Sequence, residues 1–210
     1  MGDVSRETSA PVATIPERFT QASVLLRRYA DLLATDGVTR GLIGPREVER
    51  LWDRHILNSA VVAELIPPGN SVVDVGSGAG LPGIPLALVR ADLQVTLLEP
   101  LLRRSDFLRE AVQVLELADR VRVVRERAED HRDRYDTCVA RAVAPMSRLA
   151  PWCLPLLRPG GQLLAMKGAA AEAEVTDATT ALAGTDVEIV TCGGAELAAA
   201  ATVVRVVLPR

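Results

Sequence analysis

The chain has 210 residues, of which 49% are apolar and 24% are charged. This length is enough to bury one sizeable core, and the apolar fraction excludes a disordered protein. The formal net charge of −3 excludes nucleic-acid recognition through an overall positive field, so any such contact requires a local basic patch. No apolar run approaches the roughly 18 residues of a membrane span, and Met1 begins no signal peptide. We therefore expect a cytoplasmic protein with no membrane partner.

Cysteine and histidine usage argues against disulfides and metal sites. Cys138, Cys153 and Cys192 are odd in number, far apart and outside any C-x-x-C pattern. The two histidines form no H-E-x-x-H motif. We expect three reduced, buried thiols and no metal.

The first third of the chain predicts helices. Residues 1–13 are polar and without pattern, which is typical of a mobile tail. A capping box at Thr14-Ile15-Pro16-Glu17 predicts a helix that ends at Gly37, and Pro45 predicts the start of a second helix that reaches about Leu65. We expect residues 14–210 to form a single domain, in which a helical preface over 14–66 precedes a core over 70–210.

The second helix has two different faces. Its apolar face is formed by Val48, Leu51, Trp52, Ile56, Ser59 and Val62. Arg46, Arg50 and Arg54 recur every four residues on the other face, which is either a solvated surface or a contact for RNA phosphates. His55 lies on the apolar side, where a packed core histidine is at least as plausible as a catalytic one.

From residue 71 onward strands and helices alternate. The predicted strands are 71–75, 94–98, 121–125, 136–140, 162–166, 187–191 and 202–208, and the predicted helices between them are 85–90, 103–117, 146–156 and 169–182. Such alternation indicates an α/β fold with a mostly parallel, seven-stranded sheet and helices on both faces. In such sheets the ligand lies beyond the carboxyl ends of the strands.

A glycine cluster follows the first of these strands. Gly76, Gly78 and Gly80 alternate directly after the strand, and Asp74 within the strand can brace the turn by accepting its amides. Glycines between a strand and a helix let the backbone take positive φ and approach a ligand closely. This spacing resembles the first motif of the Rossmann-like methyltransferases that bind S-adenosylmethionine, although a purely structural turn remains an alternative.

Polar residues also follow the other strands. Glu99 ends the second strand, 19 residues after Gly80, where an acid accepts the hydroxyls of an adenosine ribose. Arg141 follows the fourth strand and is either a site residue or part of a structural ion pair. Lys167 follows the fifth strand and is the only lysine beside 23 arginines, which suggests a specific role, with a solvated strand-end lysine as an equal alternative.

Six segments, in order, resemble the ribosomal RNA small-subunit methyltransferase G family, once called glucose-inhibited division protein B. They are Arg54-His55-Ile56-Leu57-Asn58-Ser59, the stretch from Asp74 to Leu86, Leu97-Leu98-Glu99, Arg103-Arg104 with Phe107-Leu108, Ala140-Arg141-Ala142 and Met166-Lys167-Gly168. The resemblance covers about residues 16 to 208. Its G-L-P-G-I-P extension and the upstream R-H-I-L-x-S are specific to the family, whereas G-x-G-x-G is shared by many methyltransferases.

The resemblance implies a cytoplasmic enzyme that transfers a methyl group from S-adenosylmethionine to N7 of one guanosine in 16S rRNA, near the decoding region of the small ribosomal subunit. It places cofactor contacts at Gly76, Leu81, Ala128, Glu129 and Arg141, with Glu99 at the ribose position, and we expect Ser77 and Gly78 of the glycine turn to bind the cofactor as well. It implies S-adenosylhomocysteine as the product and no metal. We expect a monomer.

Guanine N7 has a lone pair and no proton to remove, so we expect no catalytic base, and Arg141 is expected to orient the reactants. The candidate RNA contacts are Arg54, His55, Arg103, Arg104 and Lys167, and our hypothesis is that Arg54, Arg104 and Lys167 bind phosphates.

Other functions remain open. A nicotinamide oxidoreductase would use the shifted G-x-G-x-x-G that begins at Gly78, a methyltransferase could act on another RNA or a small molecule, and a non-enzymatic module could bind a nucleotide without transfer.

Overall fold

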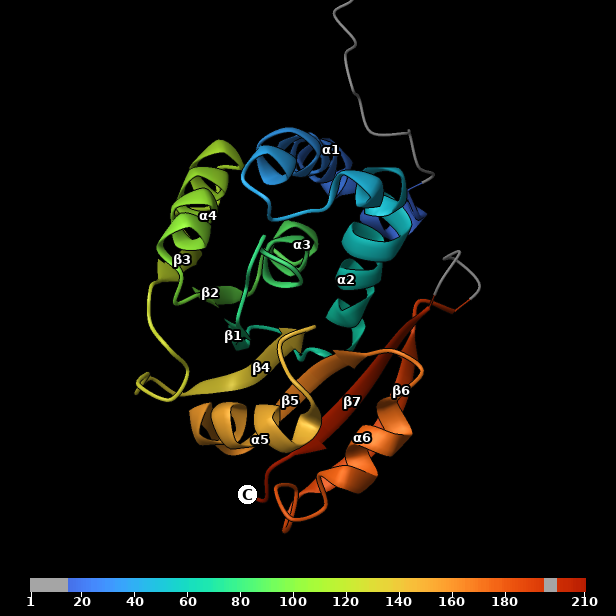
Figure 1. Ribbon diagram of the computed structural model, residues 1–210, viewed down its shortest axis with the longest axis vertical. Helices are drawn as coiled ribbons and strands as arrows, with labels where there is room; N and C mark the ends of the chain where they lie inside the picture. Colours follow the sequence, from blue (N-terminus) through green and yellow to red (C-terminus); the bar gives the residue numbers. More distant parts are fainter. Residues whose placement is uncertain (1–14, 195–199) are drawn as a thin grey trace, which may run out of the picture.

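The computed structural model describes residues 15–194 and 200–210, and there the chain forms a seven-stranded sheet between two layers of helices (Figure 1). The predicted tail over 1–13 and the capping residue Thr14 lie outside the described residues. The strands are β1 (Ser71–Val75), β2 (Gln94–Leu98), β3 (Val121–Val124), β4 (Tyr135–Arg141), β5 (Leu157–Lys167), β6 (Asp186–Cys192) and β7 (Ala201–Val207).

The sheet is mixed, with the strand order β3-β2-β1-β4-β5-β7-β6. All neighbours are parallel except for β7, which is antiparallel to both β5 and β6. The predicted mostly parallel sheet is therefore confirmed. The order reverses between β1 and β4, so the carboxyl ends of these two strands flank the crevice where such sheets bind ligands.

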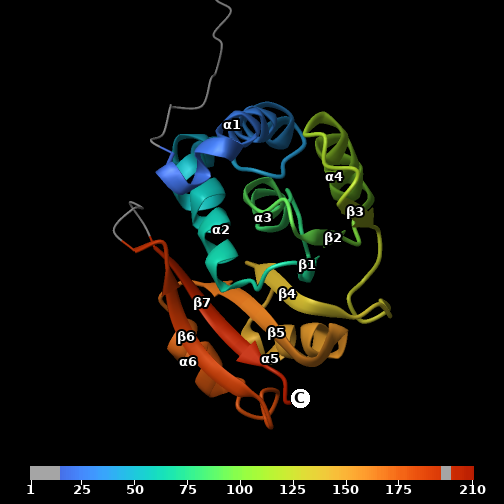
Figure 2. The same cartoon turned by 180° about the vertical axis from the view of Figure 1, so that it is seen from behind.

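Helices cover both faces of the sheet, as Figures 1 and 2 show from opposite sides. One face carries α3 (Gly83–Val89), α4 (Leu102–Val114) and the N-terminal helices, and the other carries α5 (Met146–Cys153) with η6 (Leu154–Leu156) and α6 (Ala171–Asp177). The N-terminal helices, which we call the helical preface, are η1 (Glu17–Ala22), α1 (Ser23–Leu32), η2 (Leu33–Gly37), η3 (Pro45–Arg50), η4 (Leu51–Leu57), α2 (Asn58–Ala60) and η5 (Val61–Leu65).

The prediction that the first helix ends at Gly37 is wrong, because the helical run continues to Thr39. The glycine that ends it is Gly41, which has φ +69°. The Gly41 amide donates to the Val38 carbonyl at 2.9 Å and the Leu42 amide donates to the Gly37 carbonyl at 2.8 Å. This pair of bonds forms the Schellman motif that ends many helices with a left-handed glycine.

Two other predicted boundaries are wrong by five residues, and the helix predicted over 103–117 ends three residues early, at Val114. β5 begins at Leu157 instead of Gln162, because Gly160 has φ +72° and lets the strand continue through an irregularity beside β4. The helix predicted over 169–182 is shorter in the structure, where α6 begins at Ala171 and ends at Asp177. There the hydroxyl of Thr179 donates to the Thr176 carbonyl at 2.7 Å, which competes with continued helical hydrogen bonding.

Each face of the sheet has its own apolar core. Tyr29 and Leu33 of the helical preface pack with Ile84 of α3 on one face, and Met146 of α5 packs with Leu163 of β5 on the other. Burying one large apolar side chain contributes about 1.5–3 kcal/mol. The three cysteines all lie in the described residues, where they are buried and form no disulfide. Within the described ranges no helix is both long and apolar enough to cross a membrane.

Candidate functional site

The loop after β1 contains three glycines with left-handed backbone. The φ angle is +69° at Gly76, +57° at Gly78 and +97° at Gly80, a region that glycine adopts without strain. A Cβ added to Gly80 would lie 2.4 Å from Ile84 Cδ1, whereas one added to Gly78 would meet only the Gly76 carbonyl, at 3.8 Å. Gly80 is therefore packed against protein, and the Gly78 backbone faces space into which a ligand can come.

Asp74 braces this loop from within β1. It is fully buried, and its Oδ2 accepts the Gly83 amide at 2.9 Å. The Ser77 hydroxyl donates to the Asp74 carbonyl at 2.8 Å. In the described part of the chain Asp74 Oδ1 has no hydrogen-bond partner. Burial raises the pKa of the Asp74 carboxyl to about 7, against the opposing effect of the Gly83 amide.

A second brace comes from the helical preface. Tyr29 is fully buried on α1, and its hydroxyl donates to the Ala79 carbonyl at 2.8 Å. Burial raises the pKa of this phenol well above its ordinary value, so it stays protonated and keeps its proton for the hydrogen bond. The glycine loop is thus held from the sheet by Asp74 and from the preface by Tyr29.

Glu99 connects the end of β2 to the same loop. Its side chain is only 2% exposed, and its two oxygens accept the amides of Gly78 at 3.0 Å and Leu101 at 2.9 Å. Arg104 Nη1 lies 3.9 Å from Glu99 Oε2. Each carboxylate oxygen has more than one lone pair, so Glu99 can accept further donors from a ligand.

A hollow lies over this loop, and we call it the glycine hollow. Its lining includes Leu42, Ile43, His55, Gly76, Ser77, Gly78, Ala79, Leu81, Arg104, Arg141 and Ala142. The structure therefore brings together five of the eight predicted cofactor residues with two of the predicted RNA contacts. The backbone turns sharply at this wall, since Ala142 is a non-glycine residue with φ +54°.

Arg141 fixes the helical preface to the end of β4. Its guanidinium donates to the carbonyls of Arg54 at 2.8 Å and His55 at 3.2 Å, and to the Ser59 hydroxyl at 3.1 Å. Burial lowers the pKa of Arg141 from its ordinary value. Among the described residues Arg141 forms no ion pair, and its contacts are with carbonyl, hydroxyl and imidazole groups of the helical preface.

The same guanidinium determines the state of His55. Arg141 Nη2 lies 2.7 Å from His55 Nδ1, and a guanidinium can only donate, so Nδ1 must accept. The proton of the neutral ring therefore sits on Nε2, which lies 2.8 Å from Glu47 Oε2. Burial, followed by the charge of Arg141, lowers the pKa of His55, which favours this neutral form.

A second and larger hollow of about 510 Å³ lies on the other side of Arg141 and Ala142. We call it the β4–β5 hollow, because the ends of these two strands form much of its wall. The side chains of Arg54, Lys167 and Glu174 line it with polar groups. Since both hollows share Arg141 and Ala142, a molecule in one lies next to a molecule in the other.

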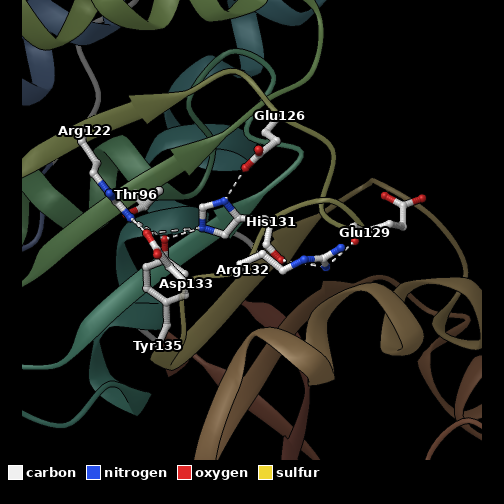
Figure 3. A network of polar contacts seen from close by, with 8 residues as sticks. All are labelled: Thr96, Arg122, Glu126, Glu129, His131, Arg132, Asp133 and Tyr135. Atoms are coloured by element: carbon white, nitrogen blue, oxygen red, sulfur yellow. Dashed lines mark hydrogen bonds and ion pairs between the residues drawn. The ribbon is translucent and has the colours of Figure 1, made fainter.

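Ala128 and Glu129 lie on the segment between β3 and β4, which a polar network holds in place (Figure 3). Its centre is the buried His131, whose Nδ1 lies 2.7 Å from Glu126 Oε2 and whose Nε2 lies 2.8 Å from the Tyr135 hydroxyl. Arg122 also binds the Tyr135 hydroxyl, at 2.9 Å, and forms an ion pair with Asp133. These two predicted residues do not line the glycine hollow.

The remaining predicted RNA contacts differ in their surroundings. Arg54 and Arg104 have side chains that are 57% and 47% exposed. Arg103 donates to the Arg40 carbonyl at 2.8 Å. Lys167 is only 8% exposed and its ammonium lies 2.7 Å from Glu174 Oε2. Among the described residues, no group of three or more His, Cys, Asp and Glu side chains could hold a metal ion.

Sequence reasoning missed Glu174 and Tyr29. Glu174 belongs to an alanine-rich segment that predicts an ordinary surface helix, and its only signal is a position seven residues after Lys167. Tyr29 follows the apolar spacing of the first helix, so nothing in its position distinguishes the residue that holds the glycine loop from its packed neighbours.

Comparisons with known proteins identify a family and several relatives. A family model described as rRNA small subunit methyltransferase G matches residues 23–198. The ribosomal RNA small subunit methyltransferase G of Thermobifida fusca is 54% identical over 205 residues, which cover 95% of this chain and 86% of that protein. The protein of the same name from Streptomyces coelicolor is 58% identical over 185 residues, or 85% of this chain and 77% of that protein.

Solved structures with much lower identity share the fold. An O-methyltransferase from Bacillus cereus in complex with SAH has a TM-score of 0.59 at 15% identity, covering 88% of this chain and 90% of that chain. A SAM-dependent O-methyltransferase from Thermotoga maritima has a TM-score of 0.55 at 14% identity, covering 78% and 70%. The predicted Rossmann-like methyltransferase fold is therefore confirmed.

Proposed function

This chain belongs to the rRNA small subunit methyltransferase G family, and we propose that it transfers a methyl group from S-adenosylmethionine to N7 of a guanosine in 16S rRNA. The observation that carries the proposal is the family match over residues 23–198, because this range contains the glycine loop, both hollows and Arg141. In this proposal residues 14–210 act as one methyltransferase domain.

The glycine hollow has the chemistry that S-adenosylmethionine requires. The backbone at Gly78 is open to a ligand, and Gly76, Ser77 and Leu81 line the space around it. Glu99 is a buried carboxylate beside Gly78 with lone pairs left for the ribose hydroxyls. We assign Ala128 and Glu129 to the adenine end of the cofactor, on a segment that the His131 network holds. No metal enters this assignment.

When bound, S-adenosylmethionine supplies an electrophilic methyl group. The acceptor N7 has a lone pair and carries no proton, so the protein needs no base. What the chain contributes is orientation, since Arg141 and Ala142 line both hollows and so keep their contents adjacent. Holding two reactants in line can lower a barrier by about 7–11 kcal/mol in favourable cases.

RNA binding is assigned to a local basic surface. The exposed Arg54 lines the β4–β5 hollow, and the exposed Arg104 lines the glycine hollow. Arg103 precedes Arg104 on α4. Phosphate contacts position a nucleic acid without reading its bases. The His55 ring forms a hydrogen bond with Glu47, and Glu47 also forms an ion pair with Arg54. His55 therefore helps to hold the Arg54 side chain in place. The proposed partner is the small ribosomal subunit, which places the enzyme in the cytoplasm, and we propose that it acts as a monomer.

The test is methyl transfer to a defined substrate. The purified protein is incubated with tritiated S-adenosylmethionine and with small ribosomal subunits from a strain that lacks this methylation, and the modified nucleoside is identified by mass. We expect 7-methylguanosine at one position of 16S rRNA. Donor binding without transfer to any RNA would contradict the proposal, and binding of NADH in place of the labelled donor would favour the oxidoreductase alternative.

A further inference from the structure

The β4–β5 hollow contains an acid–base pair that the donor site does not use, in which the Lys167 side chain is 8% exposed and that of Glu174 26% exposed. Lys167 Nζ lies 2.7 Å from both Glu174 Oε2 and the Ala144 carbonyl. Glu174 Oε2 also accepts the Met146 amide at 3.0 Å. These described contacts all use Oε2 of the glutamate and two of the three ammonium donors of the lysine, so Glu174 Oε1 and one Lys167 N–H remain for a ligand.

The pair presents an acceptor and a donor side by side within a hollow of about 510 Å³. Guanine carries the complementary pattern on one edge, where the N1–H donor is next to the O6 acceptor. Adenine carries the reverse, with an acceptor at N1 next to the donor at N6. The pair therefore matches guanine and opposes adenine at two neighbouring positions.

We propose, resting on the function proposed above, that the β4–β5 hollow takes the target guanine, with Glu174 accepting its N1–H and Lys167 donating to its O6. N7 is on the other side of O6 from N1, so this orientation leaves the reacting atom free to face the wall shared with the glycine hollow. Arg141 and Ala142 form that wall. A mispaired base would leave buried polar groups unsatisfied, which is a strong basis for selectivity.

The same contact favours the reaction as well as the base. During transfer the methyl–sulfur bond breaks, a bond to N7 forms, sulfur keeps the electron pair, and the positive charge moves to the purine without loss of a proton. The N1–H becomes more acidic as this charge develops, so its hydrogen bond to the Glu174 carboxylate strengthens in the transition state. Interactions that strengthen in this way raise kcat. The carboxylate also offsets the unfavourable nearness of the Lys167 ammonium to the new cation.

The test compares Glu174→Gln with the matched control Glu172→Gln, an exposed glutamate on the same helix. Single-turnover methyl transfer to small subunits should fall about 10- to 100-fold in Glu174→Gln, the loss expected for one hydrogen bond to a charged group. S-adenosylhomocysteine binding, measured by calorimetry, should be unchanged in both variants, and the control should transfer at the wild-type rate.

Base selectivity separates this role from a structural one. Subunits are prepared in which the guanosine that the wild-type protein modifies is replaced by adenosine. A glutamine amide can donate to adenine N1, so the ratio of guanosine to adenosine rates should drop at least about tenfold in Glu174→Gln. An unchanged ratio together with an unchanged guanosine rate would overturn the inference. If the wild-type protein transferred no methyl to subunits, the proposed function itself would fail.

If Glu174→Gln does not fold, the double variant Lys167→Met with Glu174→Met takes its place. Even for a fully buried ion pair, replacement by two apolar side chains is often neutral for stability, and this pair is partly exposed. This variant should still bind S-adenosylhomocysteine and should lose transfer to subunits. Transfer at the wild-type rate would overturn the inference equally well.

Discussion

Replacing Asp74 by asparagine is expected to stabilise the protein at pH 8 and to have little effect near pH 4. The Asp74 carboxyl is fully buried, with a pKa of about 7 in the folded protein against an ordinary value of 3.8. This difference corresponds to about 4 kcal/mol in the free energy of unfolding.

The direction follows from which state holds the proton. Between about pH 4 and pH 7 folded Asp74 keeps its proton and the unfolded chain releases it, so the free energy of unfolding falls as the pH rises. Above pH 7 the folded protein contains a buried, ionised carboxylate and the full loss applies. Asparagine can still accept the Gly83 amide and never ionises, so its advantage grows from near zero at pH 4 to about 4 kcal/mol at pH 8.

Urea unfolding of both proteins at pH 4, 5, 6, 7 and 8 measures this advantage, with Asp31→Asn as a control at an exposed carboxylate on α1. The control should show no such growth. A stability difference between Asp74→Asn and the wild type that is independent of pH, or that favours the wild type at pH 8, would refute the reasoning.

Two further predictions concern the glycine loop. Gly80→Ala combines φ +97° with a Cβ placed 2.4 Å from Ile84, and should lower the free energy of unfolding by about 3 kcal/mol. Gly69→Ala, with φ +71° and no atom within 4 Å of its Cβ, should lose clearly less, and equal losses in urea unfolding would contradict the packing argument. Tyr29→Phe leaves the Ala79 carbonyl without its donor, so it should lose about 1–3 kcal/mol and bind S-adenosylhomocysteine more weakly by calorimetry. Wild-type values for both would show that this brace is unimportant.

The sequence predicts β1 and β2 of this fold better than it predicts the helix ends or the start of β5. Strands such as Ser71–Val75 and Gln94–Leu98 are short apolar runs with glycine or acidic residues at their ends, and their bounds agree with the structure. Helix ends depend on single backbone conformations. Gly37 and Gly41 look equally suitable in the sequence, and only the left-handed φ of Gly41 identifies the one that ends the helix.

The candidate site is predictable where it is local in sequence. Gly76, Gly78 and Glu99 can be recognised because a turn and a strand end dictate their chemistry. Lys167 illustrates the limit, because its rarity attracts attention while its partner Glu174 comes from a helix that packs back over the strand end. Whether an ammonium is free for a phosphate depends on such tertiary contacts, which spacing along the chain does not encode. The predicted phosphate role of Lys167 is untested, and we propose guanine O6 in its place as the acceptor for the remaining N–H.

The contact between Arg141 and the helical preface has an evolutionary consequence. Arg141 binds residue 54 through its main-chain carbonyl, which every amino acid possesses, and leaves the Arg54 side chain facing outward. Position 55 differs, because the His55 ring itself is bound. Mutation at position 54 can therefore change the proposed RNA contact without disturbing the wall of the glycine hollow, whereas substitution of His55 would remove a contact of Arg141.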